Sequence, residues 1–207
     1  MAFDLSTPTE WNKNNAMVYL ISGLVLFASV HLFSLLWPRS RDGLLQRLGE
    51  GPYKGFYSLA SVAGVALIIW GYWIVSNGPE ASDIVYQPLP GMRHVTMLLV
   101  LLAFICIAVF HGKGHLRLWL KQPMSIGVSL WAGGHLLSNG RFYDILLFGT
   151  FLVLAMLDIV LSTARGKVPS YVPNVRSDII AVVVGGVLYV VFLFGFHPYV
   201  LHLPVVT

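Results

Sequence analysis

This chain of 207 residues has few charged residues and almost no cysteine. Only 11% of its residues are charged, whereas 57% are hydrophobic, and the mean hydropathy is +0.75. A soluble domain carries far more charge, so the composition indicates a polytopic membrane protein. The single cysteine, Cys106, excludes an intrachain disulfide and a CxxC metal or redox site. It lies in an apolar stretch, where we expect a buried structural thiol. The sequence also lacks a nucleophile elbow, a Walker loop and an HExxH motif.

Six apolar runs predict an all-α, polytopic membrane helix bundle of about six transmembrane helices, with residues 1–207 forming a single domain. The runs bracket the roughly 17–25 residues that a span needs, although the third and fourth are short. The predicted spans cover residues 17–37, 56–76, 94–110, 123–138, 142–162 and 179–199. Pro- and Gly-rich connectors separate them, the longest running from Pro38 to Gly55.

The basic residues predict the orientation. Ten of the 13 Lys and Arg residues lie in the loops that follow the first, third and fifth spans, and only Lys13, Arg93 and Arg141 lie on the other side. By the positive-inside rule, this predicts a multi-pass protein of the bacterial inner (plasma) membrane with both termini periplasmic. The sequence pI of about 9.3 does not indicate nucleic-acid binding, because the charges sit in short loops between spans. The predicted partner is membrane lipid.

Two histidines fall inside predicted spans. A charged side chain at the bilayer centre costs at least about 2.5–3.5 kcal/mol, but a neutral imidazole avoids much of this cost and can ligate a metal. His31 follows Gly23 by eight residues and precedes Ser34 by three, and His135 stands in the same relation to Gly127 and Ser138. Each set lies near one helix face. The pattern favours haem b, with His31 and His135 as axial ligands of the iron; the alternative is two neutral histidines packed between helices.

The other histidines are weaker candidates. The span limits place His31 roughly 9 Å and His135 nearer 18 Å from the same membrane face, so His94, close in depth to His135, is the alternate ligand. His111 and His115 lie in a basic loop, where solvation or lipid contact is expected. His197 and His202 are expected at the opposite interface.

Other polar and aromatic residues have simpler interpretations. Asp158 is expected to snorkel or to pair with a loop cation such as Arg165, with a proton relay as the alternative. Tyr72 and Tyr143 are assigned to interfacial aromatic belts.

Several segments, spread over roughly residues 20–160, resemble the NnrU family of bacterial membrane proteins. They are Val30-His31, Arg41-Asp42, GEGPYKGFYSLASVAGVALIIWGY at 49–72, Arg93-His94, KQPMSIG at 121–127, LWAGGHLLSNG at 130–140 and LLFGTF at 146–151. The family takes its name from bacteria in which it is needed for nitrite and nitric oxide reductase function. The resemblance therefore implies a role in denitrification or respiratory redox chemistry.

The same segments resemble zeta-carotene isomerase, a membrane haem b enzyme. By motif, its two haem-ligand histidines fall on His31 and His135. Two positions differ: Gln122 stands where the isomerase has a histidine, and Ala132 stands where it has a cysteine. A ligand exchange that uses this thiol cannot operate here, which argues against isomerase activity.

Two further alternatives remain open. KQPMSIG faintly resembles the Arg-His-Pro-x-Tyr-x-Gly motif of integral-membrane methyltransferases and sterol-type reductases, which bind S-adenosylmethionine or NADPH. Lys121, Gln122 and Ser125 replace three motif positions, and the paired acidic residues expected downstream are absent. The other alternative is a haem-free accessory or transport protein. The sequence identifies no substrate, protein partner or catalytic residue.

Overall fold

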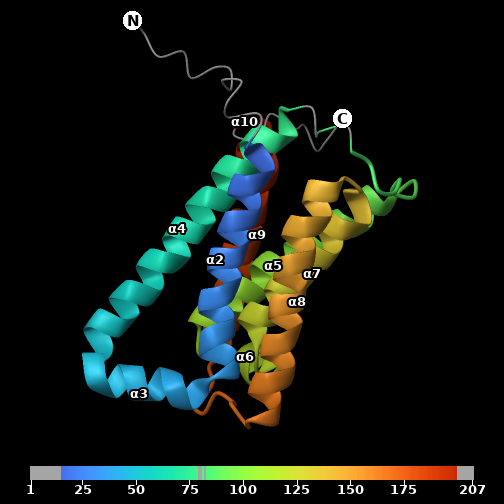
Figure 1. The fold of residues 1–207 in the computed structure, drawn as a ribbon. Coiled ribbons are helices and arrows are strands. Elements are labelled where there is room, and N and C mark those ends of the chain that lie inside the picture. Colours follow the sequence, from blue (N-terminus) through green and yellow to red (C-terminus); the bar gives the residue numbers. More distant parts are fainter. Residues whose placement is uncertain (1–14, 79–80, 82, 200–207) are drawn as a thin grey trace, which may run out of the picture. The chain divides into compact units, whose positions relative to one another are not determined.

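The structure is a computed structural model that describes residues 15–78, 81 and 83–199. Within these residues it is all-α, and the only strand-like pairing is an isolated antiparallel bridge between Ile84 and Arg141. In chain order, and as labelled in Figure 1, the helices are α2 (Ala16–Leu36), α3 (Pro38–Leu48), α4 (Glu50–Ser76), α5 (Met92–His111), α6 (His115–Leu120), α7 (Pro123–Ser138), α8 (Phe142–Ala164), α9 (Val175–Val191), the π-helix η2 (Phe192–Phe196) and α10 (His197–Tyr199).

The helices confirm the predicted fold class. Among the described residues, five helical segments are long and apolar enough to cross a membrane: α2, α4, α5, α8 and residues Val175–Tyr199. The remaining predicted span, α7, has the expected bounds but only 16 residues. At about 1.5 Å per residue it is roughly 24 Å long, shorter than a hydrocarbon core of about 30 Å. The predicted count of about six therefore agrees roughly with the structure.

Three predicted boundaries were wrong. The predicted connector from Pro38 to Gly55 is mostly helical, because Pro38 occupies the first turn of α3, a position that suits proline. Gly49, with φ of +84°, separates α3 from α4, so the second span begins at residue 50 instead of 56. The last span begins at residue 175 instead of 179, since the Asn174 side chain caps α9 by accepting a hydrogen bond from the Ser177 N–H.

The chain forms two compact units. Unit 1 comprises Met1–Tyr86 and Arg141–Thr150, and unit 2 comprises Gln87–Gly140 and Phe151–Thr207. Helix α8 thus begins in unit 1 and ends in unit 2. The single domain over residues 1–207 stays a prediction.

In unit 1, glycines bring α2 against α4. A Cβ on Gly71 would clash with the Leu20 nitrogen, and one on Gly23 would lie 2.7 Å from the Ile68 nitrogen. Only glycine permits such close backbone approach, which is how helices pack in a bilayer that offers no hydrophobic driving force between them.

In unit 2, α5 is the central helix. Gly127 of α7 faces the Ala103 carbonyl, and Gly185 of α9 faces the backbone of Ile105. The α5 residue Cys106 is buried and unpaired, which confirms that this thiol is buried.

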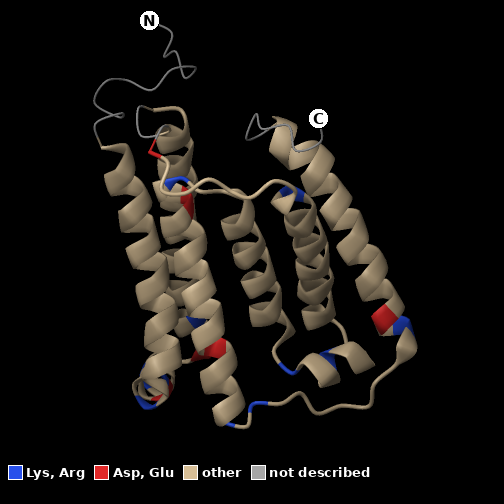
Figure 2. Cartoon of the chain, turned by 90° about the vertical axis from the view of Figure 1, so that its right-hand side faces the viewer, with Lys and Arg blue, Asp and Glu red and all other residues tan. Residues whose placement is uncertain are grey.

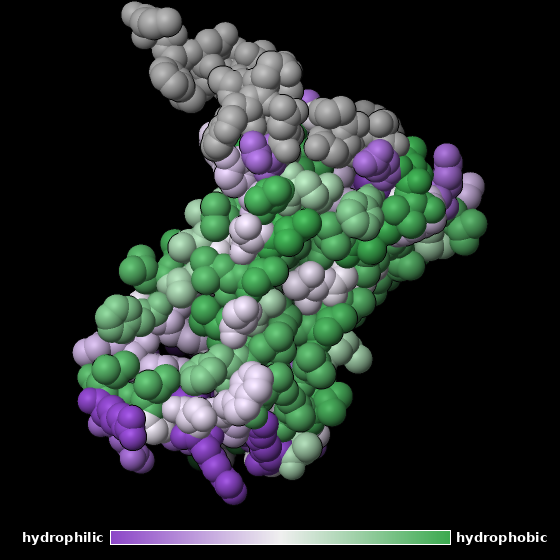
Figure 3. Space-filling view, viewed as in Figure 1, coloured by the Kyte–Doolittle hydropathy of each residue, from purple (hydrophilic) through white to green (hydrophobic). Residues whose placement is uncertain are grey.

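The outer surfaces of the long helices are apolar. Ile69, Val153 and Val187 are each more than half exposed, and hydrophobic side chains cover most of the face shown in Figure 3. Lys and Arg gather at helix ends and in loops, with long uncharged helical stretches between them (Figure 2). This distribution fits a bundle whose helices contact lipid chains.

Candidate functional site

The His31 ring is held in a fixed orientation on α2. Its Nδ1 lies 2.8 Å from the carbonyl oxygen of Phe27, one turn earlier. The imidazole also stacks on the Phe27 ring, with 4.0 Å between centroids, and it contacts the Tyr57 ring of α4 at 5.5 Å. Aromatic side chains from two helices therefore surround this histidine in unit 1.

His135 on α7 repeats this arrangement in unit 2. Its Nδ1 lies 2.8 Å from the carbonyl oxygen of Trp131, again four residues earlier. The Trp131 ring lies 5.4 Å from the imidazole, centroid to centroid. A carbonyl oxygen only accepts, so in each neutral histidine Nδ1 carries the proton and donates. The other nitrogen, Nε2, is then the one with a lone pair for a metal.

The glycine and the serine of each pattern have matching roles as well. Gly23 and Gly127 both stand where the neighbouring helix backbone passes within contact distance. Ser34 shares a hydrogen bond of 3.2 Å with the Tyr53 hydroxyl of α4, and Ser138 shares one of 2.5 Å with the Thr96 hydroxyl of α5. Each histidine thus lies between a tight helix contact and an interhelical hydrogen bond.

The histidines predicted as ligands belong to different units. His31 is in unit 1, whereas His135 and the alternate His94 are in unit 2. His94 is exposed at the start of α5, and its backbone N–H donates to the Gly91 carbonyl. Ligation of one iron by His31 and His135 stays a prediction. Within the described residues no group of three or more His, Cys, Asp or Glu side chains is placed to hold a metal ion.

The ring beside His135 is that of His197, which the sequence did not single out as a neighbour. The two imidazoles are nearly parallel, with an interplanar angle of 13° and 6.4 Å between centroids. Its Nδ1 lies 2.9 Å from the carbonyl oxygen of Phe192, five residues earlier, because η2 is a π-helix. This irregular winding has no simple signature in the sequence. His202, also expected at this interface, lies outside the described residues.

A buried polar group in unit 1 was also not predicted from the sequence. Asp144 is 4% exposed and accepts a 2.8 Å hydrogen bond from the Tyr72 hydroxyl. Arg141 donates to the Tyr143 hydroxyl at 2.7 Å, and this bond raises the pKa of the Arg141 guanidinium. Tyr143 is only 1% exposed, so it is part of the core of unit 1 rather than of an exposed aromatic belt. The spacing of Asp144 from Tyr72 along the chain gave no signal for this pair.

The loop that follows α5 is fixed to the start of α9. The Asp178 carboxylate accepts hydrogen bonds from the backbone N–H groups of His115 and Leu116, at 2.9 and 3.0 Å. The His115 Nδ1 lies 3.0 Å from the same carboxylate. His115 therefore has a specific partner in unit 2, while His111 is exposed and packs edge-on against Phe110.

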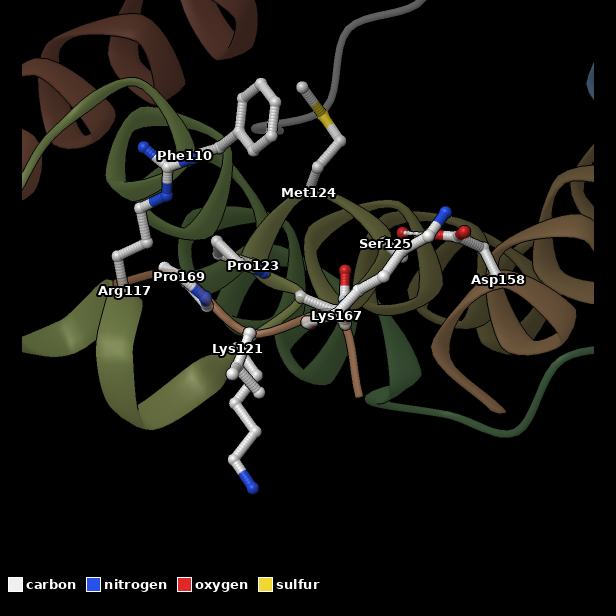
Figure 4. Close-up of a pocket in the computed structure, with 11 residues that line it drawn as sticks. Phe110, Arg117, Lys121, Pro123, Met124, Ser125, Asp158, Lys167 and Pro169 are labelled. Carbon is white, nitrogen blue, oxygen red and sulfur yellow. Dashed lines mark hydrogen bonds between the residues drawn. The ribbon is translucent and has the colours of Figure 1, made fainter. Parts of the chain in front are cut away.

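At the basic end of unit 2 there is a cavity of about 540 Å³. Figure 4 shows Arg117 and Phe110 on one side of it, and Ser125 and Asp158 on the other. Asp158 accepts hydrogen bonds from the hydroxyls of Ser125 and Ser162, so its partners are serines of the same unit. The KQPMSIG segment supplies the rim of this cavity from Lys121 to Ser125.

The comparisons with known proteins agree with the resemblance found in the sequence. A family model described as NnrU protein matches residues 19–205. No curated protein and no solved structure matches the chain.

Proposed function

The chain belongs to the NnrU family, and from this premise we propose that it binds haem b through His31 and His135 and supports denitrification or respiratory redox chemistry. The observation that carries the proposal is the matched setting of the two rings. In both, Nδ1 donates to the carbonyl oxygen of an aromatic residue one helical turn earlier.

The donor set fits a haem. An axial histidine must be neutral, must ligate through one nitrogen and must have the other nitrogen held by an acceptor. The carbonyls of Phe27 and Trp131 are such acceptors. A porphyrin supplies four nitrogen ligands itself, so two imidazoles complete the coordination without a further carboxylate or thiolate. The neighbouring rings of Phe27, Tyr57 and Trp131 would offer the apolar surface that a porphyrin requires.

When bound, a haem b with two axial histidines supplies reversible one-electron transfer. The residues of this chain would orient the two imidazoles and keep them neutral. They would also limit the access of water, since the helices around both rings have apolar outer surfaces. This chemistry suits a membrane protein that supports nitrite or nitric oxide reductases, whose reactions consume electrons.

The test is the absorption spectrum of the purified protein after expression with ample haem. We expect a low-spin, six-coordinate b-type spectrum. Replacing His31 or His135 by alanine should remove the haem or convert it to high spin, whereas His111→Ala, at an exposed position, should leave the spectrum unchanged.

His94→Ala is the discriminating variant. If it abolishes the spectrum while His31→Ala spares it, the haem proposal survives with a different ligand pair. Absence of a Soret band in the wild type would favour the alternative function, a haem-free accessory or transport protein in which the two histidines only pack between helices.

A further inference from the structure

The cavity at the basic end of unit 2 is not used by the proposed haem site, and its lining has its own chemistry. Its lining includes three cationic residues, Arg117, Lys121 and Lys167, and a single carboxylate, Asp158, although the Lys121 side chain points away from the other labelled residues (Figure 4). The site is therefore net positive. The volume of about 540 Å³ lies within the range of roughly 300–1,000 Å³ that is usual for small-molecule sites.

The cavity combines polar and apolar walls. The side chains of Phe110, Met124 and Val168 contribute apolar surface beside the cations. The carboxylate lies on the opposite side from Arg117, as Figure 4 shows, with the side chain of Lys167 extending toward it. A ligand that fills this space must place a negative group near the cations and a hydrogen-bond donor near Asp158.

The rim of the cavity is held in a strained conformation. Among the described residues that are not glycine, Lys121 alone has a positive φ, of 60°, with ψ of −50°. The Gln122 N–H donates to the Leu120 carbonyl at 2.6 Å, which closes a γ-turn around Lys121. This type of turn is rare and costs energy. The Gln122 side chain then donates to the Lys167 carbonyl at 2.7 Å, which fixes the second basic loop beside the first.

The position of the cavity along the helices indicates that its anionic ligand is a lipid headgroup. Its residues lie where α5 and α8 end and α7 begins, which is where the apolar helices give way to basic loops. Lipid phosphates lie at this depth of a bilayer, and basic pockets between membrane helices bind anionic headgroups.

We propose that this cavity binds the headgroup of an anionic phospholipid, with its phosphodiester between Arg117 and Lys167 and headgroup hydroxyls donating to Asp158. Phosphatidylglycerol has this chemistry: one negative charge on the phosphate and two hydroxyl donors beyond it. Phosphatidylcholine has no donor, and phosphatidic acid has no group beyond the phosphate. Asp158 can accept the hydroxyls because a carboxylate has about four acceptor positions and its described side-chain partners are two serines.

The experiment is a lipid titration of the purified full-length protein, followed by native mass spectrometry. Lipids with identical acyl chains are compared: phosphatidylglycerol, phosphatidylethanolamine, phosphatidic acid and phosphatidylcholine. We expect phosphatidylglycerol to be retained best. Lys167→Gln should weaken its binding about fivefold, as expected for one cation near a lipid surface. Lys113→Gln in the loop after α5 and Arg176→Gln in the first turn of α9, which remove exposed charges outside the cavity, should not.

Asp158→Asn tests the hydrogen bonds to the headgroup hydroxyls separately from the attraction between the phosphate and the cations. It should reduce the preference for phosphatidylglycerol over phosphatidic acid without lowering the affinity for phosphatidic acid. Should this variant fail to fold, Lys167→Gln, at an exposed position, still tests the proposal.

Three outcomes would overturn the proposal: equal retention of phosphatidylcholine, an equal effect of the control variants, or stronger retention of phosphatidylethanolamine than of phosphatidylglycerol. Displacement of phosphatidylglycerol by millimolar inorganic phosphate would identify free phosphate as the ligand and overturn the lipid source. The haem spectrum should be the same in every variant, so this proposal and the proposed function succeed or fail separately.

Discussion

Two glycines of α7 should respond in opposite ways to the same substitution. A Cβ on Gly127 would lie 2.9 Å from the Ala103 carbonyl oxygen and 3.2 Å from the Cys106 Cβ, whereas a Cβ on Gly133 would meet nothing within 4 Å. Replacing glycine by alanine inside a helix gains about 0.8–1.0 kcal/mol from backbone propensity at either position. Only at Gly127 must the neighbouring backbone of α5 also move.

The expected difference in stability follows from the helix propensity of alanine and from the close contact at Gly127. Overpacking a tight contact costs about 1–3 kcal/mol, so Gly127→Ala should lie about 1–3 kcal/mol below Gly133→Ala in stability. With a shift of about 2–4 °C per kcal/mol for a chain of this size, the two variants should differ by at least about 2 °C in melting temperature. Gly133→Ala should melt at or above the wild type.

Cys106 provides the assay. It is the only cysteine and is 8% exposed, so a thiol-reactive fluorogenic dye reports the opening of α5 and α7 during a thermal ramp in detergent. Gly127→Ala should react at a lower temperature, and its thiol should react faster even before unfolding. If the two variants melt together, α7 does not pack on α5 through Gly127, and the account of the helix contact is refuted.

Four further outcomes are expected. Tyr72→Phe should destabilise the protein by about 1–3 kcal/mol, because the buried Asp144 carboxylate loses its donor at 2.8 Å; a melting temperature equal to that of an exposed control, Tyr199→Phe, would contradict this. Lys121→Gly should be more stable than Lys121→Ala by about 1 kcal/mol in chemical or thermal unfolding, since only glycine relieves the positive φ; equal stability would show that the turn is not strained. Reporter fusions at both termini should be periplasmic and one after Arg47 cytoplasmic, and a cytoplasmic C-terminus would refute the six-span topology. Purified wild-type protein should show no saturable binding of S-adenosylmethionine in a titration, and saturable binding that Lys121→Ala or Pro123→Ala weakens would instead favour the methyltransferase interpretation.

The fold class was accessible from the sequence because hydrophobic length is a direct physical requirement of a bilayer. The first span was predicted to within one residue at each end, and the bounds of α7 were predicted as they are found. The errors fell at helix starts. A helix that begins in the polar region, such as Glu50 at the start of α4, shows no change in hydropathy there, and its true start depends on the backbone of Gly49.

Only part of the candidate site could be predicted from the sequence. Regular helical spacing correctly grouped Gly23, His31 and Ser34, because their contacts lie on one helix and its immediate neighbour. The pairing of Tyr72 with Asp144 joins residues 72 positions apart, and no local pattern encodes such a contact. The approach of His197 to His135 depends on a π-helical segment, which periodicity based on 3.6 residues per turn cannot anticipate.

The shortness of α7 is explained by where the chain turns before it. The γ-turn at Lys121 ends α6 and starts α7 within two residues, so α7 begins directly beside the basic cavity rather than farther out. A helix of roughly 24 Å cannot span the hydrocarbon core alone, but its glycines fit against α5, so neighbouring protein rather than lipid covers that side of it. The strained turn and the short helix are thus two parts of one arrangement, which brings Ser125 of α7 to the carboxylate of Asp158 on α8. Lengthening the helix by relieving the turn would therefore be expected to displace Ser125 from Asp158 and so change the geometry of the cavity.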